Sequence, residues 1–275
     1  MKQGKTIKSY LKVFSLILIF AFLFFNTILD QPIMVLGTGN LAELWYQNHI
    51  VIGFIAIFYI IKLHKFHFVD ILCAILFGAL MSVNSGINPV ITPITVFCYY
   101  AACCILRKYT SEDKIMPSNT KDYVKSIGIA FAVGFIPALL NIVEYYIKNG
   151  YTLPYFHFSK IITGGMEALQ PGISEEIVFR FFLYAFVVNA FKGKIPKTKT
   201  ATIMMYFLMI VPHCIMHGEF TATAFAHNPT QTILYLIYMC VIYGVPTTWL
   251  MTHKNIHSAM TAHWLYDFLR FTFTR

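Results

Sequence analysis

The chain has 275 residues, of which 57% are hydrophobic and only 12% are charged, whereas an ordinary soluble domain carries about 25% charged residues. Its mean hydropathy is +0.63. A single globular core cannot bury so much apolar surface, and lipid must solvate much of it. The composition therefore excludes a typical soluble protein. The formal net charge of +9 does not indicate nucleic-acid binding, because the Lys and Arg residues lie in short runs between apolar stretches.

Nine apolar windows are candidate membrane spans, since about 20 apolar residues cross a bilayer as a helix. The first window follows four lysines, and no small-x-small cleavage site comes after it, so we expect an uncleaved first span rather than a signal peptide. The second window is short, which leaves eight or nine spans in an all-α polytopic transmembrane helical bundle. The windows are 13–30, 48–61, 68–84, 89–106, 126–147, 173–191, 201–217, 231–252 and 256–273.

Basic residues predict the orientation of the bundle. With the N-terminus inside, sixteen of the 21 Lys and Arg residues fall in cytoplasmic segments, as the positive-inside rule requires. The N-terminus is therefore expected to be cytoplasmic. The six cysteines have no CxxC pair and no metal-finger spacing, so they are expected to be packing residues. They are Cys73, Cys98, Cys103, Cys104, Cys214 and Cys240.

The longest polar connection, 107–125, is expected to be a cytoplasmic linker. It divides the chain into an N-terminal four-span region, 1–106, and a core bundle, 126–275. The first four windows have no acidic residue away from their ends, where Asp30 and Asp70 lie, whereas ionisable residues recur inside apolar sequence after the linker. We therefore expect the chemistry in the second half. No internal repeat supports an inverted-repeat transporter.

Three charged residues open the sixth window: Glu175, Glu176 and Arg180. One charge at the middle of a spanning helix costs about 2.5–3.5 kcal/mol on insertion scales, so three together indicate a functional site. Glu176 and Arg180 are four residues apart, which predicts a salt bridge. Glu175 is turned about 100° away and lacks that partner, which suits a general base. The alternative is a water-exposed triplet at the membrane interface.

Two further pairs have helical spacing. His213 and His217 lie four residues apart at the end of the seventh window, which suits a shared metal ion, paired hydrogen bonds, or two interfacial histidines. Cys214 stands where an HExxH zinc protease has its Glu, so that motif does not apply. In the last window, His263 and Asp267 share a face, and the Asp can orient the imidazole or help it hold a polar ligand.

Topology predicts that the first two groups meet. The window 173–191 runs from outside to inside and begins with the Glu pair, whereas 201–217 runs back and ends with its histidines. His263 is about seven residues into the last window, ~10 Å, and thus nearer the middle of the membrane. All three groups lie at the same depth in the membrane if the stretch 161–169 also enters the bilayer.

These motifs resemble the CPBP family, the CAAX-protease and bacteriocin-processing intramembrane proteases, whose pattern is EExxxR, then FxxxH, then HxxxN or HxxxD. The first motif matches at 175–180 and the third at 263–267, within a resemblance that covers about 160–275. The second motif departs from the pattern, because Met209 and His213 occupy the Phe position before His213 and His217. Spacing from the Glu pair favours His213, and the following Gly218 favours His217.

The resemblance implies peptide-bond hydrolysis within the membrane, with water activated by Glu175 and a His. It also implies that His263 and Asp267 support the oxyanion. An ionised Asp267 repels an oxyanion unless it is protonated or bound to a metal, which favours a metal-binding or orienting role for it.

A divalent metal such as Zn²⁺, held by Glu175, His213 and His263 with a water in the open position, is one alternative for this site. Hydrolysis without a metal is the other. Glu176 and Arg180 would then form a clamp that fixes the helix and the first Glu.

The main functional hypothesis is an intramembrane endopeptidase that cleaves a membrane-associated peptide or a lipid-anchored protein, in a bacterial plasma membrane. A non-catalytic CPBP-like scaffold or bacteriocin-immunity protein is the second hypothesis. A proton-coupled transporter that uses Glu175, His263 and Asp267 as a relay is the third. The expected partners are the substrate and membrane lipids, without nucleic acid, and the sequence leaves the oligomeric state open.

Overall fold

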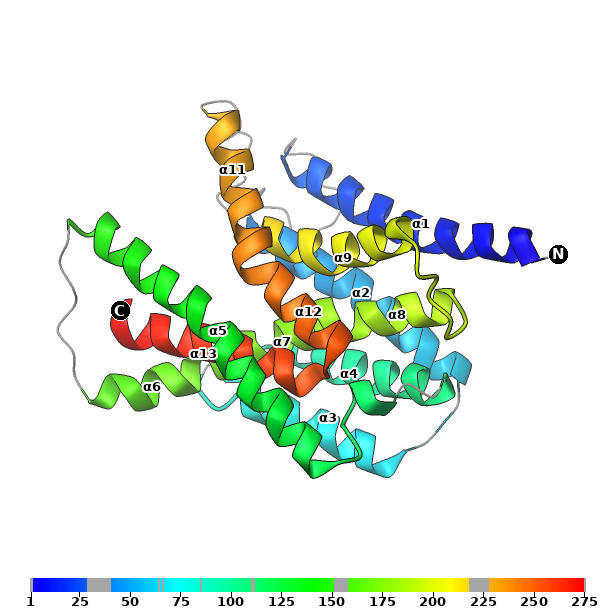
Figure 1. Ribbon diagram of the computed structural model, residues 1–275, viewed down its shortest axis with the longest axis horizontal. Coiled ribbons are helices and arrows are strands. Elements are labelled where there is room, and N and C mark those ends of the chain that lie inside the picture. The colour runs from blue at the N-terminus through cyan, green and yellow to red at the C-terminus, as the bar shows by residue number, and fades with distance from the viewer. Residues whose placement is uncertain are drawn as a thin grey trace.

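The computed structural model describes residues 2–28, 41–63, 65, 67–84, 86–109, 112–150, 158–217 and 228–274, which form helices without a strand among them (Figure 1). The all-α prediction is confirmed. The longer helices are α1 (Lys2–Ile28), α2 (Leu41–Leu63), α3 (Phe68–Met81), α4 (Ile91–Lys108), α5 (Thr120–Lys148), α9 (Lys199–Cys214), α11 (Pro229–Met239) and α13 (Ile256–Thr274). The shorter ones are η1 (Glu112–Lys114), α6 (Ser159–Glu167), α7 (Leu169–Glu175), η2 (Glu176–Phe182), α8 (Leu183–Ala190), η3 (Ile215–His217), η4 (Cys240–Gly244) and α12 (Val245–His253).

All nine apolar windows fall on helical segments in the described parts of the chain. Five helical stretches there are long and apolar enough to cross a bilayer by themselves. They are Thr6–Asn26, Leu44–Leu63, Thr120–Lys148, Lys199–His217 and Pro229–His253. The total of eight or nine spans stays a prediction.

Polar side chains cap the N-termini of several of these helices. Asn119 accepts a hydrogen bond from the backbone N–H of Lys121 at 2.9 Å and thereby caps α5. Thr198 caps α9 and Asn228 caps α11 in the same way. Because a capping oxygen satisfies an N–H group that has no partner inside the helix, these residues fix where each helix begins.

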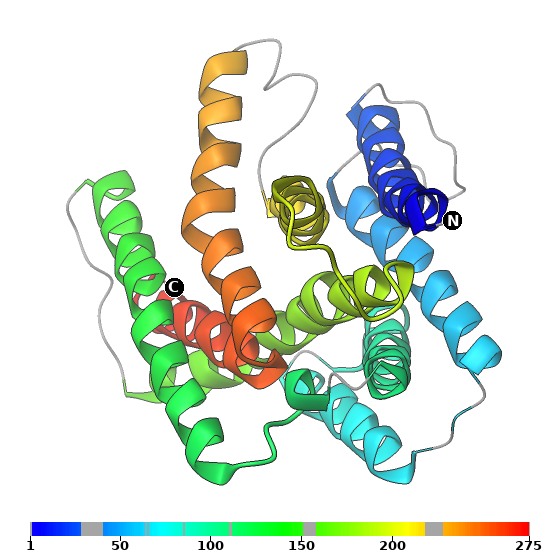
Figure 2. The same cartoon turned by 45° about the vertical axis from the view of Figure 1, so that its right-hand side comes forward.

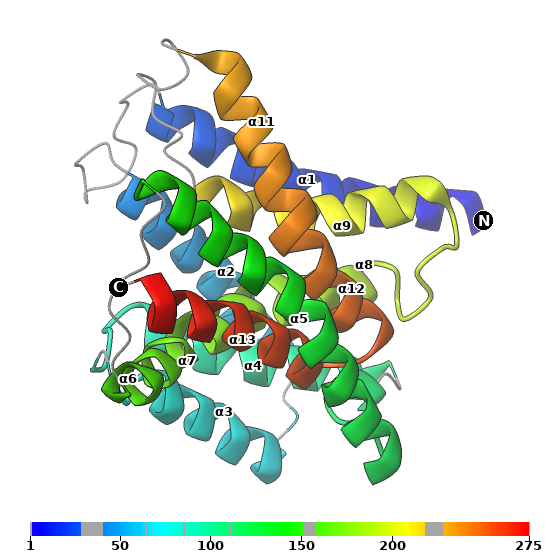
Figure 3. The same ribbon diagram turned by 60° about the vertical axis from the view of Figure 1, so that its left-hand side comes forward.

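The last helix is the centre of the C-terminal half. α13 lies along α5 and also packs against α6, α7 and α12, as Figures 1 and 3 show from two sides. The stretch 161–169, whose entry into the bilayer was the condition for the three groups to lie at one depth, forms most of α6 and the start of α7. α11 reaches beyond the other helices, and none of its side chains is buried (Figure 2). One side of the bundle is therefore loosely covered.

Three of the first four helices pack onto the segment that carries the Glu pair. α4 contacts α7 and η2, α3 contacts α7, and α2 contacts η2, while α1 lies beside α8 and α9. The connection that follows is shorter than expected, because α4 continues to Lys108 and α5 begins at Thr120. The division into a four-span region and a core bundle stays a prediction.

Candidate active site

The helix that carries the Glu pair changes its form between the two carboxylates. α7 ends at Glu175, and Glu176–Phe182 forms the π-helical segment η2. All seven side chains of η2 are buried. π-Helical turns are uncommon inside helices and often lie at functional sites. The change of form coincides with the residues that the sequence singles out.

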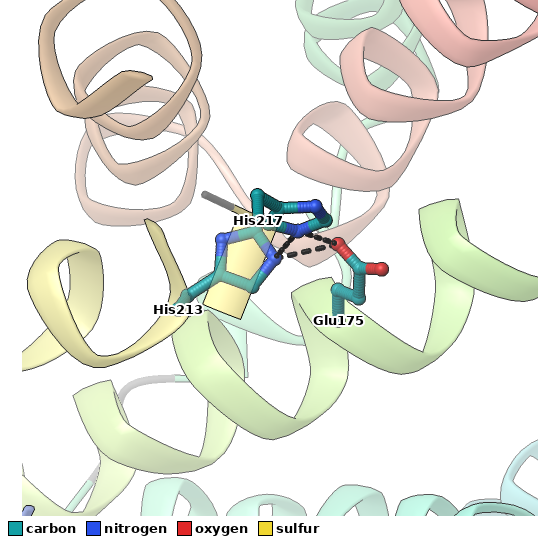
Figure 4. A group of neighbouring side chains, drawn as sticks. All are labelled: Glu175, His213 and His217. Carbon is teal, nitrogen blue, oxygen red and sulfur yellow. Dashed lines mark hydrogen bonds and ion pairs between the residues drawn. The ribbon is translucent and has the colours of Figure 1, made fainter. Parts of the chain in front are cut away.

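Glu175 meets both histidines of the seventh window. Its Oε2 lies 2.5 Å from His213 Nε2 and 3.2 Å from His217 Nε2, and the two Nε2 atoms are 2.9 Å apart (Figure 4). Glu175 and His213 are buried, whereas 29% of the His217 side chain is exposed. The predicted convergence of the two groups is therefore confirmed, and both histidines take part in it.

Glu176 faces another set of partners. Its Oε1 lies 2.7 Å from His263 Nδ1 and 3.4 Å from Arg180 Nη1. The ion pair with Arg180 was predicted from the spacing, and the contact with His263 was not. Both members of the ion pair are fully buried. Glu176 Oε2 and the three guanidinium nitrogens have no hydrogen bond to any described residue, which is unusual for buried polar groups.

His263 and Asp267 are neighbours, as their spacing predicts. His263 Nε2 lies 3.3 Å from Asp267 Oδ2 and 3.4 Å from Glu175 Oε2. Arg270 Nη2 contacts Asp267 Oδ1 at 2.9 Å. Arg270 was not among the site residues expected from the sequence. The guanidinium offsets the charge of Asp267, which removes part of the difficulty of an aspartate beside an oxyanion.

Aromatic residues of α2 form a wall of the site that the sequence analysis missed. The ring centroid of Trp45 lies 5.5 Å from that of His217 and 6.1 Å from that of His213. The ring of Phe179 packs between His49 and His213, at 5.2 and 5.3 Å. The polar run 47–49, which overlaps the start of the apolar window 48–61, was the available signal.

Glu175 lines three cavities. The largest, about 550 Å³, extends past Trp45 toward the loop between α3 and α4, and the second, about 380 Å³, extends past Glu167 toward Arg270. The third, about 60 Å³, lies among the polar side chains themselves. It is lined by Asn141, Pro171, Glu175, His213, Cys214, His217, Met239, Tyr243, His263, Tyr266, Asp267 and Arg270. The buried carboxylate of Glu175 thus borders two cavities of several hundred Å³ and a small polar one.

The structure changes the set of residues that can hold a metal. Ligand atoms of Glu175, His213 and His217 lie within 4.8 Å of one another, whereas the sequence analysis placed His263 in that set. The His263 ring centroid is 6.1 Å from that of His213, and its Nδ1 is bound to Glu176. His217 therefore replaces His263. Gly218, which the choice between the histidines also used, lies outside the described residues.

Residues 157–269 match the profile of a family described as type II CAAX prenyl endopeptidase Rce1-like. The match confirms the resemblance that the three motifs predict. It includes all seven candidate residues, from Glu175 to Asp267, and leaves α1 to α5 outside. Neither the curated proteins nor the solved structures include a significant match to the chain.

Proposed function

Because residues 157–269 match the profile of the Rce1-like type II CAAX prenyl endopeptidases, we propose that this integral membrane protein is an intramembrane endopeptidase with Glu175 as the base. The substrate is a membrane-associated peptide or a lipid-anchored protein, and prenylated tails fit the description of the matched family. The bacterial plasma membrane is the proposed location. The observation that carries the proposal is the contact of one buried carboxylate oxygen with both His213 and His217.

Glu175 is suited to move a proton between water and the leaving amine. Its carboxylate accepts a proton from a water molecule, and the resulting hydroxide attacks the carbonyl carbon of the scissile bond. The same carboxyl group then gives the proton to the leaving nitrogen as the C–N bond breaks. His213 and His217 hold the carboxylate in place through Oε2, which leaves Oε1 for water.

Glu176 and Arg180 position the first carboxylate and His263. The ion pair lies on the helix just after Glu175, and Glu176 Oε1 also fixes the His263 ring through Nδ1. Residues that lock the rotamers of catalytic groups determine how productively those groups are held. We propose positioning roles for Glu176, Arg180 and Asp267. Glu175, His213 and His217 contact water or substrate.

The donor set of Glu175, His213 and His217 fits Zn²⁺. Two imidazoles and one carboxylate form the ligand set of several catalytic zinc sites, in which a water takes the fourth position. A bound Zn²⁺ would polarise the scissile carbonyl and lower the pKa of that water. We propose Glu175 Oε2 and the two Nε2 atoms as the ligands, since these atoms already converge (Figure 4).

The test compares peptide termini released in the native host by the wild type, a deletion strain and Glu175→Ala at matched protein levels. Loss of the same products in Glu175→Ala and in the deletion strain supports the proposal. Glu144→Ala is the matched control, because Glu144 is a carboxylate of α5 that pairs with Lys148 and lines none of the three cavities. If Glu175→Ala restores every product, catalysis by this carboxylate is wrong, and the scaffold hypothesis replaces it.

A further inference from the structure

The two residues that the resemblance assigns to the oxyanion have their polar atoms directed at one another and at the Glu pair. His263 Nδ1 contacts Glu176 Oε1 at 2.7 Å, and Nε2 faces Asp267 at 3.3 Å and Glu175 at 3.4 Å. Asp267 is an acceptor that Arg270 engages at 2.9 Å. A tetrahedral intermediate needs a donor already aimed at its negative oxygen. That donor must come from another part of the cavity wall.

Asn141 of α5 offers such a donor. It lies on the wall of the same cavity of about 60 Å³ as Glu175 and His213, and it is half-buried. The hydroxyl of Tyr243 donates to Asn141 Oδ1 at 2.8 Å. An amide whose oxygen is held in this way directs its NH₂ group to the other side, and Nδ2 carries two hydrogens to donate.

The orientation of this amide is supported by neighbouring aromatic residues. The hydroxyl of Tyr238 lies 3.3 Å from that of Tyr243, and the Tyr243 ring packs edge-on against Tyr266 at 5.4 Å. Tyr266 in turn stacks on His263 at 4.5 Å. The side chains that hold the amide thus continue directly to the imidazole of the site.

We propose that Asn141 is a further catalytic residue that donates through Nδ2 to the oxyanion. When hydroxide adds to the carbonyl carbon, the C=O electron pair moves to the oxygen, where the amide stabilises it. The pair returns as the C–N bond breaks. The inference rests on the proposed endopeptidase function, and it assigns a donor on α5, outside the matched segment, because Asp267 cannot donate when ionised.

The primary test uses the purified full chain in nanodiscs and an internally quenched peptide with a farnesylated cysteine near its C-terminus. We expect Asn141→Ala and the near-isosteric Asn141→Asp to lower kcat by about 100- to 1,000-fold with little change in KM, as loss of one oxyanion donor does. Tyr243→Phe, which frees the amide to rotate, lowers kcat less. Val143→Ala is the matched control, since that α5 side chain is 50% exposed.

A second set of variants separates an oxyanion donor from a structural role. Asp267→Asn places an amide at the family's HxxxN position, so we expect Asn141→Ala to lower kcat much less in that background than in the wild type. Equal losses in both backgrounds overturn the proposal. Arg270 lines the same cavity, and a kcat loss in Arg270→Gln without one in Asn141→Ala assigns the role to that guanidinium instead.

The same assay separates this inference from the proposed function. If the wild type cleaves the peptide no faster than Glu175→Gln does, the endopeptidase proposal fails, and the Asn141 assignment fails with it. If the wild type is active, Glu175→Gln is inactive and Asn141→Ala keeps its kcat within about threefold, the Asn141 assignment alone is wrong.

Discussion

Among the carboxylate–arginine pairs in the described helices, Asp70–Arg107 in the first half and Glu176–Arg180 in the second are built differently. Asp70 of α3 receives two hydrogen bonds from Arg107 of α4, at 2.7 and 2.8 Å, and Arg107 also reaches Glu112 at 3.0 Å. Glu176 has one contact of 3.4 Å with Arg180. The first pair is a bidentate salt bridge that joins two helices. The second is an incomplete pair inside one helix.

The difference fits a structural role for the first pair and the proposed positioning role for the second. The Arg107 side chain is 25% exposed, so water can also hydrate its guanidinium group. Arg180 is fully buried, and its partner Glu176 also holds His263. Buried polar groups with unused hydrogen-bonding capacity are rare in structural networks, and they mark sites where something else binds or moves.

The largest expected effect compares the two arginines by substitution. Arg180→Met leaves Glu176 as a buried charge without its partner, which costs about 3–5 kcal/mol of stability. Arg107→Met removes an arginine side chain that is 25% exposed, so water that takes its place can hydrate the buried Asp70, and we expect a cost of about 1–3 kcal/mol. Denaturant unfolding in the same detergent measures both. If Arg107→Met destabilises the protein more than Arg180→Met does, the contrast between the two pairs is wrong.

Zinc addition tests whether the second half of the chain binds a ligand that the Asp70–Arg107 pair does not affect. We expect Zn²⁺ at 100 times its Kd to stabilise the wild type by about 2.7 kcal/mol, since it binds only the folded protein. His213→Gln and His217→Gln should abolish the shift, whereas His263→Gln and Arg107→Met should keep it. A shift that survives both of the first two substitutions contradicts a site built from Glu175, His213 and His217.

The sequence predicted those parts of the site that depend on helical spacing and topology. The Glu176–Arg180 and His263–Asp267 contacts follow from a separation of four residues. The meeting of Glu175 with His213 follows from the directions of two successive helices.

The remaining contacts depend on packing between distant segments. Glu176 and His263 are 87 positions apart in the chain, and nothing in the periodicity relates η2 to α13. Trp45 and Asn141 lie on helices that the family match does not include. The π-helical form of η2 also cannot be predicted from apolar residues that repeat with a period of 3.6.

The smallest expected effect concerns two glycines of α5, the helix that carries Asn141. A Cβ at Gly134 would lie 2.7 Å from the backbone oxygen of Ala262 and 2.9 Å from its Cα. A Cβ at Gly128 would meet nothing within 4 Å. Small residues let neighbouring helices approach closely inside a membrane. Gly134 therefore sets the separation of α5 and α13 just beside His263, while Gly128 does not.

Gly134→Ala is expected to destabilise the protein by about 1–3 kcal/mol, because backbone atoms of α13 must move to admit the methyl group. The movement shifts His263 relative to Glu176, so we expect kcat to fall as well. Gly128→Ala is the matched control, and it should raise stability by about 0.5–1 kcal/mol, since alanine favours a helix interior more than glycine does. Unfolding and peptide cleavage measured on both variants check this. A Gly134→Ala variant as stable and as active as Gly128→Ala would show that the α5–α13 contact does not fix the geometry of the site.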